Sequence, residues 1–349
     1  MIDIQQKIHT DYPLQSANTL GFPSVAEQFV AVESEAGLLA AIAYAHQYRL
    51  PIRVLSGGSN VLMLPRIDGL VIRIDIMGRL VTEAADTIEV VLGAGENWHE
   101  TVSWCVDKGY SGIESMGLIP GRVGAAPVQN IGAYGTELKH VLAKVRALDV
   151  EKNCFIEFSN RDCEFAYRDS VFKRLAGRFI ITEVTLQLSR IQDRSIRYAA
   201  LQNYFEQRHI IQPDVRQVFD AVCAVRQSKL PDPSILGNAG SFFKNPVISE
   251  SQYQLIKQQW PALVAYPDAP GFMKLAAGWL IDQCEWKGKK RAHVGVYEKQ
   301  ALVLVHFGGG QLDDLLQLAS DIQASVSEVF DVKLEIEPQL FPAQISVNS

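Results

Sequence analysis

The sequence predicts an α+β protein, in which strands of antiparallel or mixed sheet are combined with helices. The segments 145–150, 154–158 and 179–188 show the apolar–polar alternation that is typical of such strands. In the segment 35–50 the apolar residues recur with a helical period instead. The length of 349 residues is enough for two or three domains.

Local signals mark where the predicted elements begin and end. Ser34 precedes the first helix, where its hydroxyl suits an N-cap, and Gly109 follows the second, where glycine commonly ends a helix. A change to charged and polar residues within 191–230 indicates a domain boundary. The predicted strands are 52–55, 69–75, 87–92, 145–150, 154–158, 179–188 and 301–306, and the predicted helices are 35–50, 97–108, 215–228, 276–284 and 312–330.

Composition and charge exclude several classes of protein. Lys and Arg number 33 against 39 Asp and Glu, the net charge is -6, and no basic stripe occurs, so nucleic acid is not expected as a partner. The five cysteines form no Cys-x-x-Cys pair, which argues against a disulfide framework and a structural metal site. No signal-peptide pattern and no membrane-spanning apolar run occur, so we expect a cytoplasmic protein without membrane contact.

The run from Gly237 to Pro246 places one hydroxyl, Ser241, after a flexible Asn-Ala-Gly and before two phenylalanines. Glycine lets the backbone approach a ligand closely, and the phenylalanines can bury and fix the turn. This arrangement suits a positioned proton donor, although a serine after glycine is more often an ordinary turn residue. No Gly-x-Ser-x-Gly motif surrounds Ser241, which weakens a hydrolase interpretation.

Two further segments are consistent with nucleotide binding. The turn 56–60 follows a predicted strand, and its backbone N–H groups can hold a pyrophosphate, although for this segment alone a connecting turn is the favoured interpretation. The tract 117–135 is rich in glycine, and a purely structural loop of that length is uncommon in a compact domain. We therefore expect the backbone of this tract, the glycine tract, to approach a large flat cofactor. The Rossmann fingerprint and the P-loop are both absent.

Arg168 is a candidate for contact with an acidic substrate group, whereas two glutamates near the end of the chain have an ordinary interpretation. Arg168 lies among aromatic residues, and its guanidinium suits bidentate binding of a carboxylate, although a surface ion pair with Asp169 is an equal alternative. The segment 334–338 alternates apolar and acidic residues like a strand. That pattern would place Glu335 and Glu337 on one face, which is usually the solvent-facing one.

Together these segments resemble the UDP-N-acetylenolpyruvoylglucosamine reductases, also called UDP-N-acetylmuramate dehydrogenases, from about residue 20 to 340. The most specific motifs are 117–121, 129–135, 167–170, 229–233, 237–246 and 274–284. The tract around Tyr266 and the segment 191–230 resemble the longer subtype of this family, in which a tyrosine loop covers the substrate.

The resemblance implies an FAD-binding module of the vanillyl-alcohol-oxidase type, made of two subdomains, together with a substrate domain. Residues 1–75 and the tail 338–349 would form the first subdomain, 76–229 the second, and 230–337 the substrate domain. FAD would be bound noncovalently between the two subdomains. The implied cofactor-binding residues are Ser56, Gly57, Gly58, Ser59, Asn60, Gly117, Pro120, Gly121, Gly124, Gln129, Asn130, Ile131, Gly132, Ala133 and Tyr134.

The resemblance also implies a reaction. NADPH would reduce the flavin, which would then reduce the enolpyruvyl group of UDP-N-acetylglucosamine enolpyruvate to UDP-N-acetylmuramate in peptidoglycan precursor synthesis. Arg168 would polarise the enolpyruvyl carboxylate, Glu337 would orient it, and Ser241 would donate a proton to the resulting enolate. The positions that match substrate contacts are Tyr198, Lys229, Asn245, Tyr266, Lys287 and Gln300. We expect a monomer.

Two positions depart from the family pattern. The last motif usually reads Glu-Pro-Glu followed by Val-Arg, but here a shifted proline leaves Glu335 as the alternative to Glu337. Arg122 stands where a small residue or cysteine is common.

Two other functions stay open. An oxidase of the same fold often tethers FAD through His or Cys, and neither residue occurs within 117–135. A noncatalytic flavin or nucleotide-sugar binding protein would keep the glycine tract without needing Ser241, Arg168 and Glu337.

Overall fold

The computed structural model describes residues 4–192 and 198–342, and the chain divides into two compact units. Unit 1 comprises Met1–Tyr12, Ala26–Gly57 and Asp68–Arg226, and unit 2 comprises Pro13–Val25, Gly58–Ile67 and Gln227–Ser349. Residues 1–3, 193–197 and 343–349 lie outside the described residues. They belong to the predicted first subdomain, the predicted second subdomain and the predicted C-terminal tail. The division into two FAD subdomains and a substrate domain stays a prediction.

The first sheet of unit 1 has four strands in the order β1-β2-β5-β3. These are β1 (His9–Pro13), β2 (Val25–Val32), β5 (Arg66–Ile74) and β3 (Ile52–Leu55), and β3 pairs parallel with β5. Helix α1 (Glu35–Gln47) begins after Ser34, whose hydroxyl accepts the N–H of Gly37 as the sequence predicts.

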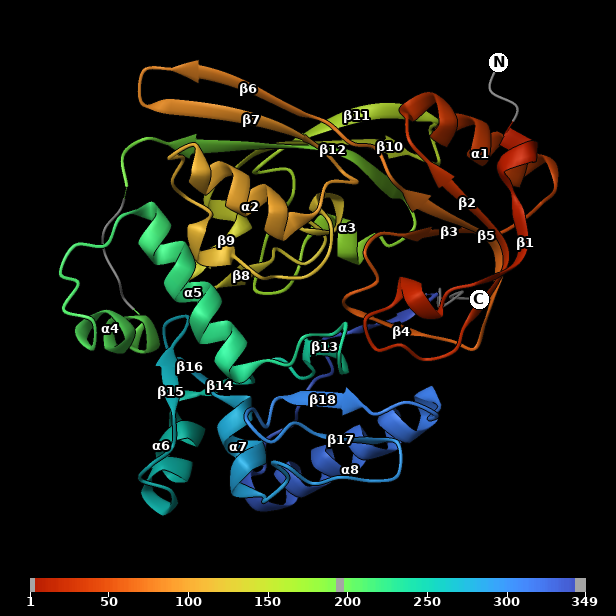
Figure 1. The fold of residues 1–349 in the computed structure, drawn as a ribbon. Helices are drawn as coiled ribbons and strands as arrows, with labels where there is room; N and C mark the ends of the chain where they lie inside the picture. Colours follow the sequence, from red (N-terminus) through yellow and green to blue (C-terminus); the bar gives the residue numbers. More distant parts are fainter. Residues whose placement is uncertain (1–3, 193–197, 343–349) are drawn as a thin grey trace. The chain divides into compact units, whose positions relative to one another are not determined.

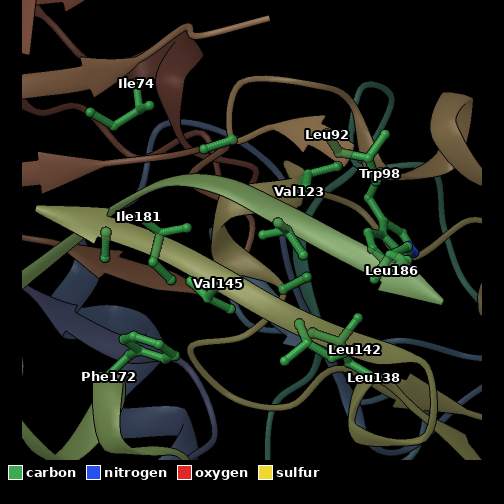
Figure 2. Close-up of a cluster of buried hydrophobic side chains, with 14 of the residues drawn as sticks. Ile74, Leu92, Trp98, Val123, Leu138, Leu142, Val145, Phe172, Ile181 and Leu186 are labelled. Atoms are coloured by element: carbon green, nitrogen blue, oxygen red, sulfur yellow. The ribbon is translucent and has the colours of Figure 1, made fainter. Parts of the chain in front are cut away.

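The second sheet of unit 1 is antiparallel, in the order β11-β10-β12-β7-β6 (Figure 1). Its strands are β6 (Arg79–Ala84), β7 (Thr87–Gly93), β10 (Leu142–Asp149), β11 (Cys154–Ser159) and β12 (Phe179–Ser189). Helix α2 (Trp98–Asp107) begins after Asn97, whose side chain accepts the N–H of Glu100. Leu92, Val145 and Leu186 lie with Trp98 in a continuous core that also includes side chains of α1 (Figure 2).

Shorter elements complete unit 1, and η4 and β8 lie within the glycine tract. They are the 3₁₀ helices η1 (Ile4–Lys7), η3 (Glu114–Met116), η4 (Val123–Ala125) and η5 (Leu138–His140), the two-residue strands β8 (Gly132–Ala133) and β9 (Thr136–Glu137), and the helices α3 (Val171–Arg174), α4 (Ala199–Glu206) and α5 (Val215–Lys229). The last three residues of α5 belong to unit 2.

Unit 2 contains two three-stranded sheets, β13-β18-β17 and β14-β16-β15, and the parallel pair β19-β4. Its elements are η2 (Gln15–Ala17), β4 (Val61–Met63), β13 (Gly237–Ser241), β14 (Val247–Ser249), α6 (Glu250–Gln259), β15 (Ala265–Pro267), β16 (Phe272–Leu275), α7 (Ala277–Gln283), β17 (Val294–Val296), β18 (Val303–His306), α8 (Leu312–Phe330) and β19 (Gln339–Phe341). Helix α8 buries Leu315, Leu318 and Ile322 in the core of this unit.

The α+β fold class is confirmed, and the predicted helices and most predicted strands are present. The strand expected at 334–338 is wrong, because only an isolated bridge between Phe243 and Ile336 forms there. The sequence patterns missed α4, which has only eight residues, and α6, which is mostly polar. Within residues 4–192 and 198–342, none of the helices combines the length and the hydropathy needed to cross a bilayer.

Candidate functional site

The glycine tract has an unusual backbone. Three of its residues other than glycine, Leu118, Asn130 and Tyr134, have φ of 56°, 45° and 51°, in the left-handed region. Such conformations are costly and often occur at functional sites, where the surroundings impose them. The tract also contains the short elements η4 and β8, although the sequence predicts no regular structure there.

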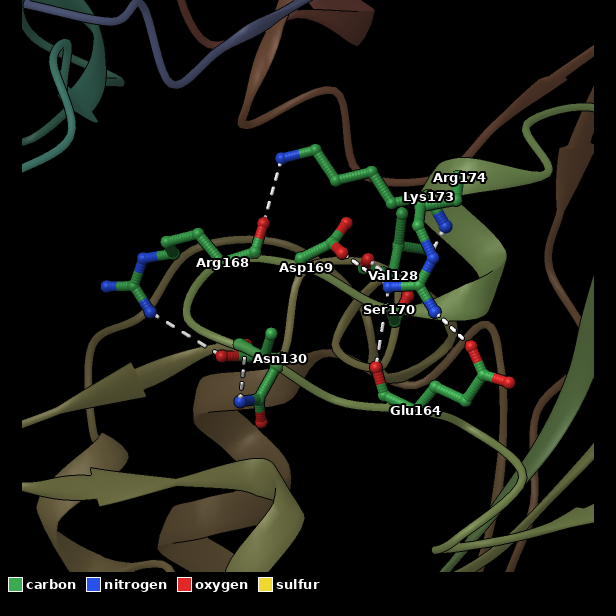
Figure 3. Close-up of polar contacts among 9 residues, drawn as sticks. Val128, Asn130, Glu164, Arg168, Asp169, Ser170, Lys173 and Arg174 are labelled. Carbon is green, nitrogen blue, oxygen red and sulfur yellow. Dashed lines mark hydrogen bonds and ion pairs between the residues drawn. The ribbon is translucent and has the colours of Figure 1, made fainter. Parts of the chain in front are cut away.

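Asn130 is fully buried and fixes the middle of the glycine tract (Figure 3). Its Nδ2 donates to Glu137 Oε2 at 3.0 Å and to Ala166 O at 3.1 Å, and its Oδ1 accepts the N–H of Lys139 at 3.0 Å. All the hydrogen-bonding groups of this side chain are therefore used within the protein. The structure gives Asn130 a positioning role, whatever it contacts on a ligand.

Arg168 also lies against the glycine tract. Its guanidinium donates to Gly132 O at 3.1 Å. It also donates to Asn130 O at 3.5 Å (Figure 3). The alternative ion pair with Asp169 does not form, because the carboxylate of Asp169 binds Arg174 instead. The guanidinium of Arg168 thus lies beside the protein backbone that is predicted to contact the cofactor.

Several predicted cofactor glycines are explained by contacts within the chain. A Cβ on Gly57 would lie 2.9 Å from Gly121 Cα, and one on Gly58, where φ is 61°, would lie 1.9 Å from Ala17 O. Gly132 and Gly124 are crowded in the same way by Thr136 O and by Ala94. Close contacts between segments of the same chain therefore account for these glycines without any cofactor.

The remaining residues of the predicted cofactor set differ in exposure. Ser56 Oγ is buried and, in the described part of the chain, accepts and donates no hydrogen bond. A buried hydroxyl without a partner is uncommon and indicates a place for a ligand group. Of the others, Gly117 and Ile131 are buried, Ser59, Asn60, Gln129 and Ala133 are partly buried, and Pro120 is exposed.

Two residues that the sequence analysis missed contact Leu118. The Nη2 atom of Arg226, on α5, donates to Leu118 O at 3.2 Å. His99, on α2, accepts the N–H of Leu118 through Nδ1 at 3.1 Å and stacks on Phe219. An arginine on the buried face of an amphipathic helix was the available signal for Arg226.

Ser241 ends β13 in unit 2 and is exposed. Just before it, Gly240 has φ of 69°, and the pairing with β18 shifts register between Asn238 and Ser241. Asn238 Oδ1 accepts the N–H of Gly240 at 2.9 Å, which supports this irregularity. Phe242 and Phe243 are fully buried, as the sequence predicts, so the turn presents the serine hydroxyl on a rigid base.

The two alternative glutamates have different surroundings. Glu337 is buried, and its N–H donates to Phe242 O at 2.9 Å, next to Ser241. Glu335 has a side chain that is 71% exposed and pairs with Lys244. The two side chains do not share a solvent-facing side, and the position of Glu337 favours it as the carboxylate that acts with Ser241.

The predicted substrate residues are spread over both units. In unit 2, Asn245 Oδ1 accepts the N–H of Ala277 at 3.0 Å, and Gln300 Oε1 lies 2.9 Å from the place of a Cβ on Gly278, so both flank the start of α7. In unit 1, Tyr198 packs edge to face on Tyr134 at 5.1 Å. Lys229, Tyr266 and Lys287 are exposed, and Lys287 pairs with Asp282 at 3.3 Å.

Unit 1 therefore brings Arg168, Asn130 and the glycine tract together, and unit 2 brings Ser241 and Glu337 together. A guanidinium can bind a carboxylate, and an exposed hydroxyl beside a buried carboxyl group can donate a proton. That these two halves meet on one substrate stays a prediction.

Comparison with known proteins identifies the family. The family described as "FAD binding domain" matches residues 26–152, and the one described as "UDP-N-acetylenolpyruvoylglucosamine reductase, C-terminal domain" matches residues 232–341. A UDP-N-acetylenolpyruvoylglucosamine reductase of Pseudomonas fluorescens is 45% identical, covering 96% of this chain and 99% of its own length. The protein of that name from Bordetella pertussis is 47% identical, covering 95% and 94%.

A solved structure agrees with the fold. The UDP-N-acetylenolpyruvylglucosamine reductase of Thermus caldophilus aligns with a TM-score of 0.65 at 22% identity, covering 96% of this chain and 98% of that one. The matches confirm the predicted family and FAD-binding domain, while the roles of single site residues stay predictions. On the strength of these similarities over almost its whole length, the chain belongs to the UDP-N-acetylenolpyruvoylglucosamine reductase family.

Proposed function

We propose that this chain uses NADPH and FAD to reduce the enolpyruvyl group of UDP-N-acetylglucosamine enolpyruvate, which yields UDP-N-acetylmuramate for peptidoglycan synthesis. Membership of the reductase family over nearly the full length supports this reaction. The structural observation on which the proposal rests is the pair formed by Ser241 and Glu337. Ser241 is exposed and Glu337 is buried, and two backbone hydrogen bonds, from Glu337 N–H to Phe242 O and from Lys244 N–H to Glu335 O, hold their segments side by side.

The residues of unit 1 fit FAD. Ser56 Oγ is buried without a hydrogen-bond partner among the described residues, so a polar cofactor group would satisfy it. The turn 56–60 and the glycine tract would hold the cofactor, and Arg168 stands beside that tract. When bound, FAD supplies hydride transfer from NADPH to the enolpyruvyl double bond.

The side chains of this protein would divide the remaining work. Arg168 would bind the substrate carboxylate and stabilise the negative charge that develops on it. Glu337 would orient that group. Ser241 Oγ would donate its proton to the carbon that bears the ether oxygen, which is favourable because an enolate is a strong base.

The test separates the two halves of the reaction. Under anaerobic conditions NADPH should bleach the yellow protein, and the enolpyruvyl UDP-sugar should restore the colour. Ser241→Ala should bleach normally and recover its colour about 10²- to 10⁴-fold more slowly, the usual contribution of a general acid. Ser320→Ala, an exposed position on α8, is the matched control. Recovery of Ser241→Ala at the normal rate would contradict the proposal.

We also propose that the enzyme acts as a monomer in the cytoplasm. The even spread of charge and the absence of an apolar run in the sequence support this. Light scattering of the holoenzyme should give the mass of one chain, and a mass of two chains would rule the monomer out.

A further inference from the structure

One face of helix α5 lies directly against the start of the glycine tract. A Cβ on Gly117 would lie 2.9 Å from Phe219 Cε2 and 3.3 Å from Cys223 Sγ. Phe219, Cys223 and Arg226 are spaced by four and three residues, so they occupy the same face of the helix. Arg226 continues that contact with its hydrogen bond to Leu118 O.

The charge of Arg226 has no compensating anion in the described part of the chain. Among the described residues its guanidinium donates to Leu118 O, and the Nε atom is buried without a hydrogen bond. Burial is the largest influence on the pKa of Arg226 and lowers it; Tyr134 and Cys223 raise this pKa by less, and the charge of Arg168, the smallest influence, lowers it.

The two neighbours that could carry negative charge are neutral at physiological pH. Burial raises the pKa of the Cys223 thiol to about 11, and burial also raises the pKa of the Tyr134 phenol above its ordinary value of 10.0. A buried cation without an anion is costly, and such groups are normally paired in folded proteins. Other arginines of unit 1 follow that rule, since Arg79 binds Glu96 and Arg146 binds Glu35.

We propose that Arg226 is an anion-binding residue that neutralises a negatively charged group of the bound flavin cofactor. This inference rests on the proposed function, because it takes the glycine tract as the cofactor site. The cofactor is favoured over the UDP-sugar because the neighbours of Arg226 lie on α5, in the glycine tract, or beside that tract at Arg168 and at His99, which binds Leu118 N–H. The ligand thus supplies the missing counter-charge.

The experiment compares Arg226→Met and Arg226→Lys in the full-length protein. Apoprotein is titrated with FAD, and quenching of flavin fluorescence gives the Kd without any substrate. Arg226→Met should raise the Kd for FAD at least tenfold, and Arg226→Lys should retain part of the lost affinity. The KM for the UDP-sugar at saturating FAD should change less than twofold. The control is Arg216→Met, an exposed residue of the same helix that pairs with Asp107 and should leave the Kd unchanged.

The melting temperature of the apoprotein distinguishes binding from a structural role. Because the charge is uncompensated without cofactor, Arg226→Met should melt at the same temperature as the unmodified apoprotein or higher. A lower melting temperature with an unchanged Kd would overturn the proposal in favour of a structural role. An unchanged Kd with a raised KM would overturn it in favour of the UDP-sugar. Neither outcome depends on whether the sugar reoxidises the flavin, which tests the proposed function separately.

Discussion

Backbone hydrogen bonds support both the glycine tract of unit 1 and the Ser241 segment of unit 2, but the tract depends in addition on side chains from several other elements. Side chains hold the tract: Asn130 binds Glu137, Ala166 and Lys139 outside it, Arg226 binds Leu118 O, and Ser170 Oγ donates to Val128 O at 2.6 Å. Backbone pairs hold the Ser241 segment, since Phe242 N–H donates to Leu302 O and Phe242 O accepts from Glu337.

This difference determines how each region responds to substitution. A loop that depends on single side chains loses its shape when one of them is replaced. A segment that is fixed by backbone pairing keeps its shape when a side chain changes. We therefore expect structure and chemistry to be coupled in the glycine tract and separable at Ser241.

Asn130→Ala should have the largest effect on stability. The substitution removes three partly buried hydrogen bonds and places alanine at a φ of 45°. We expect the free energy of unfolding of the apoprotein to fall by about 3 kcal/mol, as measured by urea denaturation. Asn153→Ala is the matched control, because Asn153 also has a positive φ of 51° but is exposed in a turn. Equal losses in the two variants would show that backbone conformation alone explains the effect.

Arg122→Ala should have the next largest effect. The guanidinium of Arg122 donates to Ile74 O at 2.7 Å and pairs with Asp75, which also binds Arg73. It thereby ties the glycine tract to the end of β5. Because Asp75 keeps Arg73, we expect a loss of about 1–2 kcal/mol in the free energy of unfolding. The control Arg53→Ala removes an ion pair with the exposed Asp68 and should lower the free energy of unfolding by less. A larger loss in Arg53→Ala than in Arg122→Ala would contradict a stabilising link between Arg122 and the end of β5.

The sequence predicted the elements with strong periodicity and clear ends. Helix α1, with the N-cap at Ser34, and the strands of the five-stranded sheet follow from local pattern alone. Helix α6 escaped notice because most of its residues are polar and one, Ile256, is buried. The segment at 334–338 alternates like a strand, but its neighbours offer a single bridge.

The candidate site was predictable only in part. The glycine tract and Arg168 stand out as motifs, but the role of Asn130 depends on Ala166 and Lys139, whose approach no local pattern reveals. Arg226 has no motif, and its importance comes from what is missing around it. Missing partners can be recognised only when the surrounding chain is folded.

A smaller effect should follow from pH at His99, which accepts the N–H of Leu118. Burial lowers the pKa of its imidazole below the ordinary 6.5; Glu100 opposes this shift and Arg226 adds to it. The folded state therefore binds the proton less well than the unfolded state. The neutral imidazole of His99 therefore stabilises the fold above pH 6.5. This contribution is lost as the pH falls through the lower pKa that His99 has in the folded state.

Melting temperatures of the apoprotein at several pH values check this expectation for His99. His99→Gln should melt at a temperature that depends less on pH below 6.5 than that of the unmodified protein. His46→Gln, an exposed position on α1, should keep the full dependence. The same dependence in all three proteins would assign the pH effect to other groups.

Glu335→Gln should change least, because Glu335 is mostly exposed and its ion pair with Lys244 is screened by solvent. We expect less than about 0.5 kcal/mol in the free energy of unfolding and a turnover number within twofold of normal. Glu337→Gln should instead lower turnover strongly, since its backbone is bonded to Phe242 beside the proton donor. Steady-state assays of the two variants give the comparison. If Glu335→Gln were the inactive variant, Glu335 would be the carboxylate required for turnover. The backbone pairing of Glu337 with Phe242 would then not account for the position of that carboxylate.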